Sequence, residues 1–250
     1  MMPRPLDPQA ALFLDVDGTL LEIAARPELV QLPPTLLSLL ELLTQQRDGA
    51  LALVSGRCIA DLDNLFDPWR GAAAGMHGAE RRRADGSYVE PADSPADREA
   101  GAALDRLRPA LRQFVRHSSG LLLEDKGKTL ALHYRLAPHL GAVSREFAER
   151  LIAEESDRLR LIAGKMVFEL QPRHHGKDGA IAAFMAEPPF RGRLPVFLGD
   201  DTTDEDGFVE VNGRGGQSIR TGPASAATAA TFSLPSVSAV REWLTQGLAV

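Results

Sequence analysis

A short apolar segment near the amino terminus, residues 10–14, runs directly into Asp15-Val16-Asp17-Gly18. An apolar run this short, followed at once by a turn residue, is typical of a buried parallel strand rather than of a helix. Side chains two positions apart on a strand share a face, so Asp15 and Asp17 leave its carboxyl end side by side. In an open α/β sheet, ligands bind at that end of the strands.

Two neighbouring carboxylates repel each other unless a cation or a shared proton lies between them. Mg²⁺ is the simplest such cation, because it takes oxygen ligands and keeps several waters. The alternative is that Asp15 and Asp17 cap a turn in which Gly18 supplies a positive φ. Taken alone, the tetrapeptide favours the turn, so the rest of the sequence has to decide between the two.

A second apolar segment, residues 50–54, ends in Ser55-Gly56-Arg57. Ser55 occupies the position on its strand that Asp15 occupies on the first. A serine there can donate to a phosphoryl oxygen, and Gly56 lets backbone N–H groups approach that oxygen. Ser-Gly-Arg is also a common turn, and on its own the segment does not distinguish a phosphate site from a turn.

A third apolar segment, residues 194–199, ends in an acidic cluster, residues 200–206, with five carboxylates. The cluster is either a solvated loop or, beside Asp15 and Asp17, part of an oxygen-rich Mg²⁺ site. A solvated acidic loop does not usually end a buried strand, which favours the metal site. Lys177 comes just before an expected helix, where its charge would add to the free N–H groups that bind phosphate. An isolated lysine would otherwise be a solvated surface residue.

The order of these segments resembles the four motifs of the haloacid dehalogenase (HAD) superfamily. In chain order they are Asp15-x-Asp17 with Gly18-Thr19-Leu20, then Ser55, Lys177 and the acidic cluster. The resemblance implies a Rossmann-like α/β core with a parallel sheet, and phosphoryl transfer through an aspartyl-phosphate. It further implies Asp15 as nucleophile and Asp17 as general acid and base. An aspartate at that second position points to hydrolysis or mutase chemistry.

The middle of the chain has a different pattern from the α/β segments on either side. It predicts a helix through Leu104 towards Val115, strands over 120–126 and 129–136, a helix over 143–155 and a strand over 165–170. We therefore expect a smaller α+β cap domain, residues 94–171, inserted into a core domain. That core domain would consist of residues 1–93 and 172–250.

Several further segments look like those of the trehalose-6-phosphate phosphatase family. They are Ser55-Gly56-Arg57, His77-Gly78-Ala79-Glu80, Glu124-x-Lys126, His133-Tyr134-Arg135, Lys165-x-x-x-Glu169-x-x-Pro172 and Gly199-Asp200-Asp201-x-Thr203-Asp204-Glu205. The resemblance extends from motif I nearly to the carboxyl terminus and implies a C2-type cap between motifs II and III. One position departs from the family pattern, because Asp178 separates Lys177 from Gly179 where lysine directly before glycine is usual.

This resemblance implies Mg²⁺-dependent hydrolysis of trehalose 6-phosphate. Ser55 and Lys177 would neutralise phosphoryl oxygens. Asp15, the backbone carbonyl of Asp17 and Asp200 would hold the metal, with Asp201 and Asp204 supporting waters or neighbouring groups. The implied substrate-binding residues are Arg57, His77, Glu124, Lys126, Arg135 and Glu169, with a weaker match for His133 and Lys165. Taken singly, His77 fits a plain turn, and each charged cap residue fits the solvated face of an antiparallel sheet.

The composition excludes other classes of partner. The chain has 250 residues, a formal net charge of −6 and one cysteine, Cys58. The acidic balance argues against nucleic acid or an anionic membrane as the main partner, and we interpret Arg81-Arg82-Arg83 as a solvated edge. A single cysteine forms no intrachain disulfide and suits a reducing compartment. With no apolar signal-peptide core in residues 1–8 and no run long enough to span a membrane, we expect a cytoplasmic protein.

Three functions remain open at this level. The first is hydrolysis of trehalose 6-phosphate, a small-molecule sugar phosphate. The second is another HAD sugar phosphatase, of the sucrose or glucosylglycerol type, or a phosphomutase. The third is a phosphatase-like domain that regulates a trehalose-phosphate synthase. The intact catalytic set argues against the third, and association with a synthase is left open.

Overall fold

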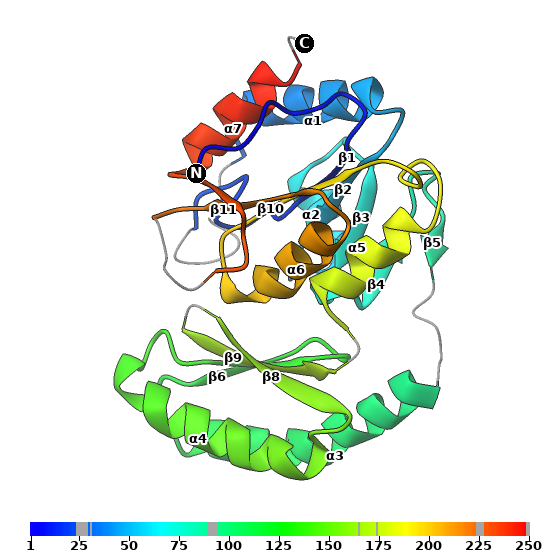
Figure 1. The fold of residues 1–250 in the computed structure, drawn as a ribbon. Helices are drawn as coiled ribbons and strands as arrows, with labels where there is room; N and C mark the ends of the chain where they lie inside the picture. Colours follow the sequence, from blue (N-terminus) through cyan, green and yellow to red (C-terminus); the bar gives the residue numbers. More distant parts are fainter. Residues whose placement is uncertain are drawn as a thin grey trace. The chain divides into compact units, whose positions relative to one another are not determined.

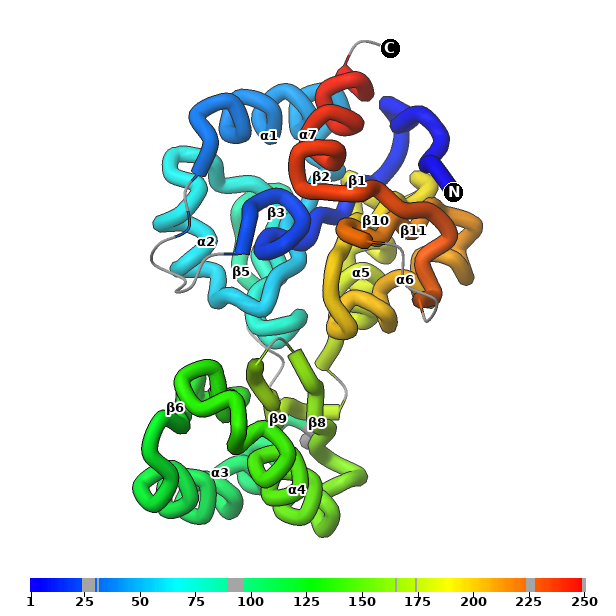
Figure 2. Tube along the Cα trace, turned by 90° about the vertical axis from the view of Figure 1, so that its left-hand side faces the viewer, coloured from blue at the N-terminus to red at the C-terminus, as the bar shows by residue number. Residues whose placement is uncertain are grey.

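The computed structural model describes residues 1–23, 30, 32–89, 95–164, 166–173, 175–223 and 228–248. The chain divides into two compact units, which Figures 1 and 2 show. The core unit comprises Met1–Pro91 and Gly176–Val250, and the inserted unit comprises Ala92–His175. The sequence placed the insertion at residues 94–171. Residue 94 lies outside the described residues, and residue 171 lies within a strand that continues to Pro172.

The core unit is built on an eight-stranded sheet in the order β12-β11-β10-β1-β2-β3-β4-β5. The pairs from β12 to β3 are parallel, and β4 and β5 are added antiparallel at one edge. This confirms the expected α/β core with a parallel sheet. The strands are β1 Ala11–Leu14, β2 Leu51–Val54, β3 Ala72–Gly75, β4 Glu80–Arg82, β5 Tyr88–Val89, β10 Pro195–Gly199, β11 Gln217–Thr221 and β12 Phe232–Leu234.

Helices cover both faces of this sheet, with α1 and α7 on one side and α5 and α6 on the other (Figure 1). On β1, Leu12 and Leu14 pack into the first cluster and Phe13 into the second, because alternate side chains point to opposite faces. A strand buried on both faces is therefore apolar throughout. The helices are α1 Pro34–Gln46, α2 Ile59–Leu65, α5 Lys177–Met185, α6 Glu205–Gly213 and α7 Val237–Gln246, with short 3-10 turns η2 Met76–Gly78 and η5 Thr202–Asp204.

The inserted unit is a four-stranded antiparallel sheet, in the order β6-β7-β9-β8, that packs one face against α3 and α4. Its strands are β6 Leu122–Asp125, β7 Leu130–His133, β8 Leu159–Gly164 and β9 Val167–Pro172, and its helices are α3 Pro95–Arg116, α4 Gly141–Ile152, η3 Pro138–Leu140 and η4 Ala153–Glu155. The sequence pattern did not indicate β8. The strand expected over 165–170 is β9, which begins after Met166, a residue with a φ of +62°, and continues to Pro172.

The run of three arginines is not a solvated edge, and that interpretation was wrong. Arg82 is 3% exposed and its Nη1 lies 2.7 and 2.8 Å from the two carboxylate oxygens of Asp63. Arg81 and Arg83 both form ion pairs with Glu187. The reason is that β4 lies between β3 and β5, so its charges are neutralised within the core unit.

No helix in the described part of the chain has the length and apolar character needed to cross a bilayer.

Candidate active site

Three neighbouring parallel strands of the core unit end at one edge of the sheet, and a polar residue follows each. Leu14 of β1 lies opposite Leu198 of β10, and β2 pairs on the other side of β1. The residues that follow, Asp15, Ser55 and Asp200, therefore begin at the same edge. The N–H of Asp15 continues the ladder by donating to the carbonyl of Leu198 at 2.9 Å.

A buried lysine joins two carboxylates at this edge. Lys177 is the first residue of α5, and its Nζ lies 2.7 Å from Asp15 Oδ1 and 2.5 Å from Asp204 Oδ1. Its side chain is 2% exposed. Charged groups this deeply buried persist only when they are paired and hydrogen-bonded. Lys177 therefore reaches Asp15 even though Asp178 separates it from Gly179.

The acidic cluster after β10 is a turn and a helix start rather than a solvated loop. Asp204 is fully buried, and its Oδ2 accepts hydrogen bonds from the N–H groups of Asp200 at 2.9 Å and Asp201 at 3.0 Å. Asp201 caps η5 by accepting from the N–H of Thr202 at 2.7 Å. Glu205 and Asp206 begin α6, a helix that sequence analysis missed. Asp204 thus orients the turn that presents Asp200.

Burial dominates the electrostatics of this cluster. It is the main reason why the pKa of Asp15 rises from 3.8 to about 8, and the carboxylates of Asp204 and Asp200 add to the rise while Lys177 opposes it. For Lys177, burial lowers the pKa, but the charges of Asp15 and Asp204 outweigh burial and hold it above its ordinary value. Lys177 therefore stays positively charged, and the carboxyl group of Asp15 beside it resists ionisation as long as no further cation is bound.

The residues of this cluster fit a hard divalent cation. One carboxylate oxygen from each of Asp15, Asp200 and Asp204 lies within 4.8 Å of the others, an all-oxygen set of the kind that Mg²⁺ prefers. Oδ2 of Asp15 is buried and accepts no hydrogen bond from the residues that the structure describes. Gly18, at a φ of +89°, brings the backbone so close that a Cβ there would lie 2.1 Å from Asp200 Oδ2.

Asp17 lies apart from that acidic group, because its carboxylate is bound by Arg57. Nε of Arg57 donates to Oδ2 at 2.6 Å and Nη2 donates to Oδ1 at 2.7 Å. This hydrogen bond is the main reason why the pKa of Arg57 lies above its ordinary value. Sequence analysis assigned Arg57 to the substrate and did not anticipate this pair.

The loop after β2 is held by the turn after β3. Ser55 is 1% exposed, its Oγ accepts from the N–H of Arg57 at 3.2 Å, and its carbonyl accepts from the N–H of His77 at 2.9 Å. Met76 and His77 both have positive φ, 49° and 55°. Consecutive left-handed residues other than glycine store strain that the surrounding structure must enforce. The His77 ring lies against Gly56, where a Cβ would be 2.7 Å from Nε2.

In the inserted unit, most of the expected sugar-binding residues share one face of the sheet. Glu124 lies opposite Ala131, which lies opposite Glu169, and the second face of these strands forms the apolar core with α3 and α4. Nε2 of His133 lies 2.9 Å from Glu124 Oε2, and the hydrogen bond between them lowers the pKa of Glu124. The register therefore places Glu124, His133 and Glu169 on the face opposite the apolar core.

A second pair on this face surrounds Glu169, which is 7% exposed. Its Oε1 lies 3.4 Å from Lys126 Nζ and accepts a 2.9 Å hydrogen bond from Thr129 Oγ1, a residue that sequence analysis missed. Arg135 is not on a strand as expected, because β7 ends at His133 and Arg135 is an exposed turn residue. Lys165 lies outside the described residues.

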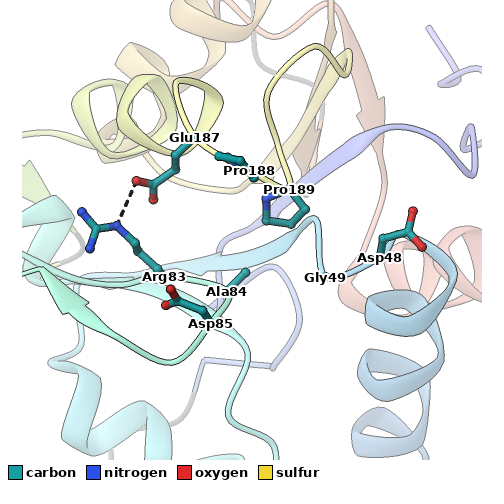
Figure 3. A pocket seen from close by; sticks show the side chains of 8 residues that line it. All are labelled: Asp48, Gly49, Arg83, Ala84, Asp85, Glu187, Pro188 and Pro189. Carbon is teal, nitrogen blue, oxygen red and sulfur yellow. Dashed lines mark hydrogen bonds and ion pairs between the residues drawn. The ribbon is translucent and has the colours of Figure 1, made fainter.

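A pocket of about 600 Å³ opens elsewhere on the core unit (Figure 3). It lies between the turn before β2, the β4–β5 turn and the loop after α5, and the Arg83–Glu187 ion pair forms part of its wall. Because Gly49 precedes β2 whereas Ser55 follows it, the pocket lies at the opposite edge of the sheet from Asp15. Its lining contains none of the expected site residues. It is lined by Asp48, Gly49, Arg83, Ala84, Asp85, Glu187, Pro188 and Pro189.

Comparison with known proteins places this site in a family. The family model for trehalose-phosphatase matches residues 13–238. A probable trehalose-phosphate phosphatase of Sinorhizobium fredii is 42% identical over 92% of this chain and 84% of its own. The trehalose-6-phosphate phosphatase of Escherichia coli is 43% identical over 96% of this chain and 86% of its own.

Solved structures agree on the fold. The C-terminal domain of C. albicans trehalose-6-phosphate phosphatase superposes with a TM-score of 0.83 at 23% identity, over 97% of this chain and 93% of that chain. A HAD-superfamily phosphatase from Bacteroides thetaiotaomicron gives a TM-score of 0.63 at 18% identity, over 99% and 98%. The chain therefore belongs to the trehalose-phosphatase family.

Proposed function

We propose that this protein hydrolyses trehalose 6-phosphate to trehalose and phosphate, with Mg²⁺ as cofactor and an aspartyl-phosphate on Asp15 as intermediate. The observation that supports this chemistry best is the state of Asp15. One of its oxygens is held by Lys177 at 2.7 Å, and the other is buried and accepts no hydrogen bond from the described residues. A carboxylate with one oxygen fixed and one oxygen unengaged is suited to nucleophilic attack.

In the first half-reaction, Oδ2 of Asp15 forms a bond to phosphorus as the bond from phosphorus to the sugar oxygen breaks. Asp17 gives its proton to that leaving oxygen. Lys177 and the hydroxyl of Ser55 stabilise the negative charge on the other phosphoryl oxygens. In the second half-reaction, Asp17 takes a proton from water, the oxygen of that water forms a bond to phosphorus, and the bond between Asp15 Oδ2 and phosphorus breaks to release phosphate.

Asp15 and Asp200 are the carboxylates that would hold the metal, with the backbone carbonyl of Asp17 as a third ligand and Asp204 as their support. Asp15 would use Oδ1 for the metal, because Oδ2 is the oxygen that attacks phosphorus. When bound, Mg²⁺ supplies positive charge next to the phosphoryl oxygens and favours the ionised form of Asp15. Without it, a pKa of about 8 leaves Asp15 largely protonated at neutral pH, which is unsuited to attack.

The sugar part of the substrate is assigned to charged residues of the inserted unit. Hydroxyl groups donate and accept, so carboxylates and cations can each bind them. We propose this role for Glu124, Lys126 and Glu169, whose shared sheet face supports it, and for Arg135 on the turn after β7. Within the core unit, His77 is the residue that we propose as a substrate contact beside Gly56. On the evidence of a single cysteine, we also propose a cytoplasmic location.

The test is phosphate release from a panel of sugar phosphates, including trehalose 6-phosphate, sucrose 6-phosphate, glucosylglycerol phosphate and glucose 6-phosphate, with Mg²⁺ and with a chelator. We expect release from trehalose 6-phosphate to exceed the others by about 100-fold or more in kcat/KM, and to stop in the chelator. Release that favours another sugar phosphate would reject the substrate. Full activity in excess chelator would reject the cofactor.

A further inference from the structure

The guanidinium of Arg57 grips the carboxylate of Asp17 through both oxygens. The two donors, Nε and Nη2, lie on the same side of the planar group, at 2.6 and 2.7 Å from Oδ2 and Oδ1. The side chains are 14% and 35% exposed. Among the described residues, Arg57 is the side chain that donates hydrogen bonds to the Asp17 carboxylate. Such a fork fixes the plane and the rotation of a carboxylate, which one hydrogen bond does not.

Hydrogen bonds to neighbouring segments hold the backbone around Arg57. Its carbonyl accepts from the N–H of Met76 at 2.9 Å and its N–H donates to Ser55 Oγ at 3.2 Å. Two residues later, the N–H of Ile59 donates to Glu80 Oε2 at 2.9 Å as α2 begins. The loop is therefore tied to the far side of β3. Asp17 lies on the turn after β1 next to Gly18, whose φ is +89° and whose N–H donates to the carbonyl of Leu21 at 2.7 Å.

We propose that Arg57 is a positioning residue for Asp17. The proposal rests on the proposed function, in which Asp17 moves protons to the leaving oxygen and from water. The guanidinium keeps its own protons in both half-reactions and holds the carboxylate where those transfers occur. Family resemblance assigned Arg57 to substrate binding instead, and the two roles predict different kinetics. Loss of a positioning contact lowers kcat, whereas loss of a uniform binding contact raises KM.

The leaving group offers a sharp readout. A leaving group of low pKa, such as p-nitrophenolate, departs with little protonation, whereas an alkoxide needs a well-placed acid. In Arg57→Gln we expect kcat for alkyl phosphates to fall about 10- to 100-fold, with KM changed by less than about 2-fold, and kcat for p-nitrophenyl phosphate to fall much less. Arg57→Lys keeps the charge but cannot form the fork, so we expect it to recover little of the loss.

A double-mutant cycle with Asp17→Asn completes the test. If Arg57 acts through Asp17, Arg57→Gln should reduce alkyl phosphate turnover no further in the Asp17→Asn background. The matched control is Arg214→Gln, which removes an arginine paired with Glu210 on the surface of α6 and should keep wild-type kinetics.

Three results would overturn the proposal: KM rising equally for every substrate, effects of the two substitutions that multiply, or full recovery in Arg57→Lys. Hydrolysis of alkyl phosphates and of p-nitrophenyl phosphate, here called the monoester series, does not depend on sugar recognition. A wild-type enzyme that hydrolyses the series but not trehalose 6-phosphate would therefore reject the proposed substrate, while the comparison of the Arg57 variants would still stand.

Discussion

At the scale of single residues, the main feature of the site is that ionisable groups are buried. Asp15, Asp204 and Lys177 are each 5% exposed or less, and the ammonium group of Lys177 contacts both carboxyl groups. The hydrogen bond from Lys177 fixes one oxygen of Asp15 without engaging the other. That asymmetry supports the proposed role of Asp15 as nucleophile.

Replacing one carboxylate oxygen of Asp15 by an amide group is the most direct test at this scale. Asp15→Asn keeps the shape of the side chain and a hydrogen-bond acceptor for Lys177, so we expect a folded protein. Turnover of any phosphate monoester should fall by at least about 10³-fold, because an amide is a poor nucleophile. Phosphate release and circular dichroism measure the two properties. Near-native turnover by Asp15→Asn would exclude covalent catalysis at this residue.

At the scale of elements, the strand ends and their turns set the distances between functional groups. The turn after β1 depends on Gly18, whose missing side chain leaves room for the carboxylate of Asp200. The face of the β6–β7–β9 sheet that lies away from α3 and α4 brings Glu124, Lys126 and Glu169 together. Each arrangement can be tested with a matched control.

Gly18→Ala should disturb the metal site more than it disturbs the fold. Gly18 and Gly86 have nearly the same backbone angle, φ of +89° and +84°, so alanine adds similar strain at each. Only at Gly18 would the new Cβ meet a side chain, at 2.1 Å from Asp200 Oδ2, whereas Gly86 has nothing within 4 Å. Titration calorimetry should show at least about 10-fold weaker Mg²⁺ binding for Gly18→Ala and unchanged binding for Gly86→Ala. Equal affinities would remove Asp200 from the metal site.

Glu169→Gln tests the sheet face. The substitution removes the charge that faces Lys126 and keeps an acceptor for Thr129. We expect kcat/KM for trehalose 6-phosphate to fall by the equivalent of about 1.5–3 kcal/mol, with p-nitrophenyl phosphate little affected. Glu149→Gln, on an exposed ion pair of α4, is the control and should affect neither substrate. Parallel losses for both substrates would make this face structural.

At the scale of the whole molecule, burial of Asp15 links folding to pH and to metal. The pKa of Asp15 is raised from 3.8 to about 8, so between these values the folded chain binds more protons than the unfolded chain. The free energy of unfolding therefore falls as pH rises through this window. A cation that binds only the folded chain opposes the loss.

This linkage predicts the outcome of urea unfolding in chelator. From about pH 5 to about pH 8, the wild-type midpoint should decrease more than that of Asp15→Asn, which has no carboxyl to ionise. Adding Mg²⁺ at about pH 8 should raise the wild-type midpoint and leave Asp15→Asn nearly unchanged. Identical pH profiles for the two proteins would mean that Asp15 does not control this linkage.

Local patterns in the sequence were sufficient to determine the α/β class, the family and several of the polar residues that lie at one edge of the sheet. Asp15, Ser55 and Asp200 each follow a short apolar strand, and parallel neighbouring strands end at one edge of the sheet. Lys177 was predicted at a helix start and lies there. These features depend on a few adjacent residues, which is why one sequence reveals them.

Only the tertiary structure decided which charges meet. Arg57 binds Asp17 across 40 positions of sequence, and Lys177 binds Asp204 across 27. Arg82 is buried because β4 has a strand on each side, and Arg135 lies on a turn because β7 ends two residues earlier. The partner of a charged side chain depends on strand order and register, which are set by packing of the whole core. A single sequence carries no local pattern for strand order or register. Ion pairs between distant segments therefore become visible only in the fold.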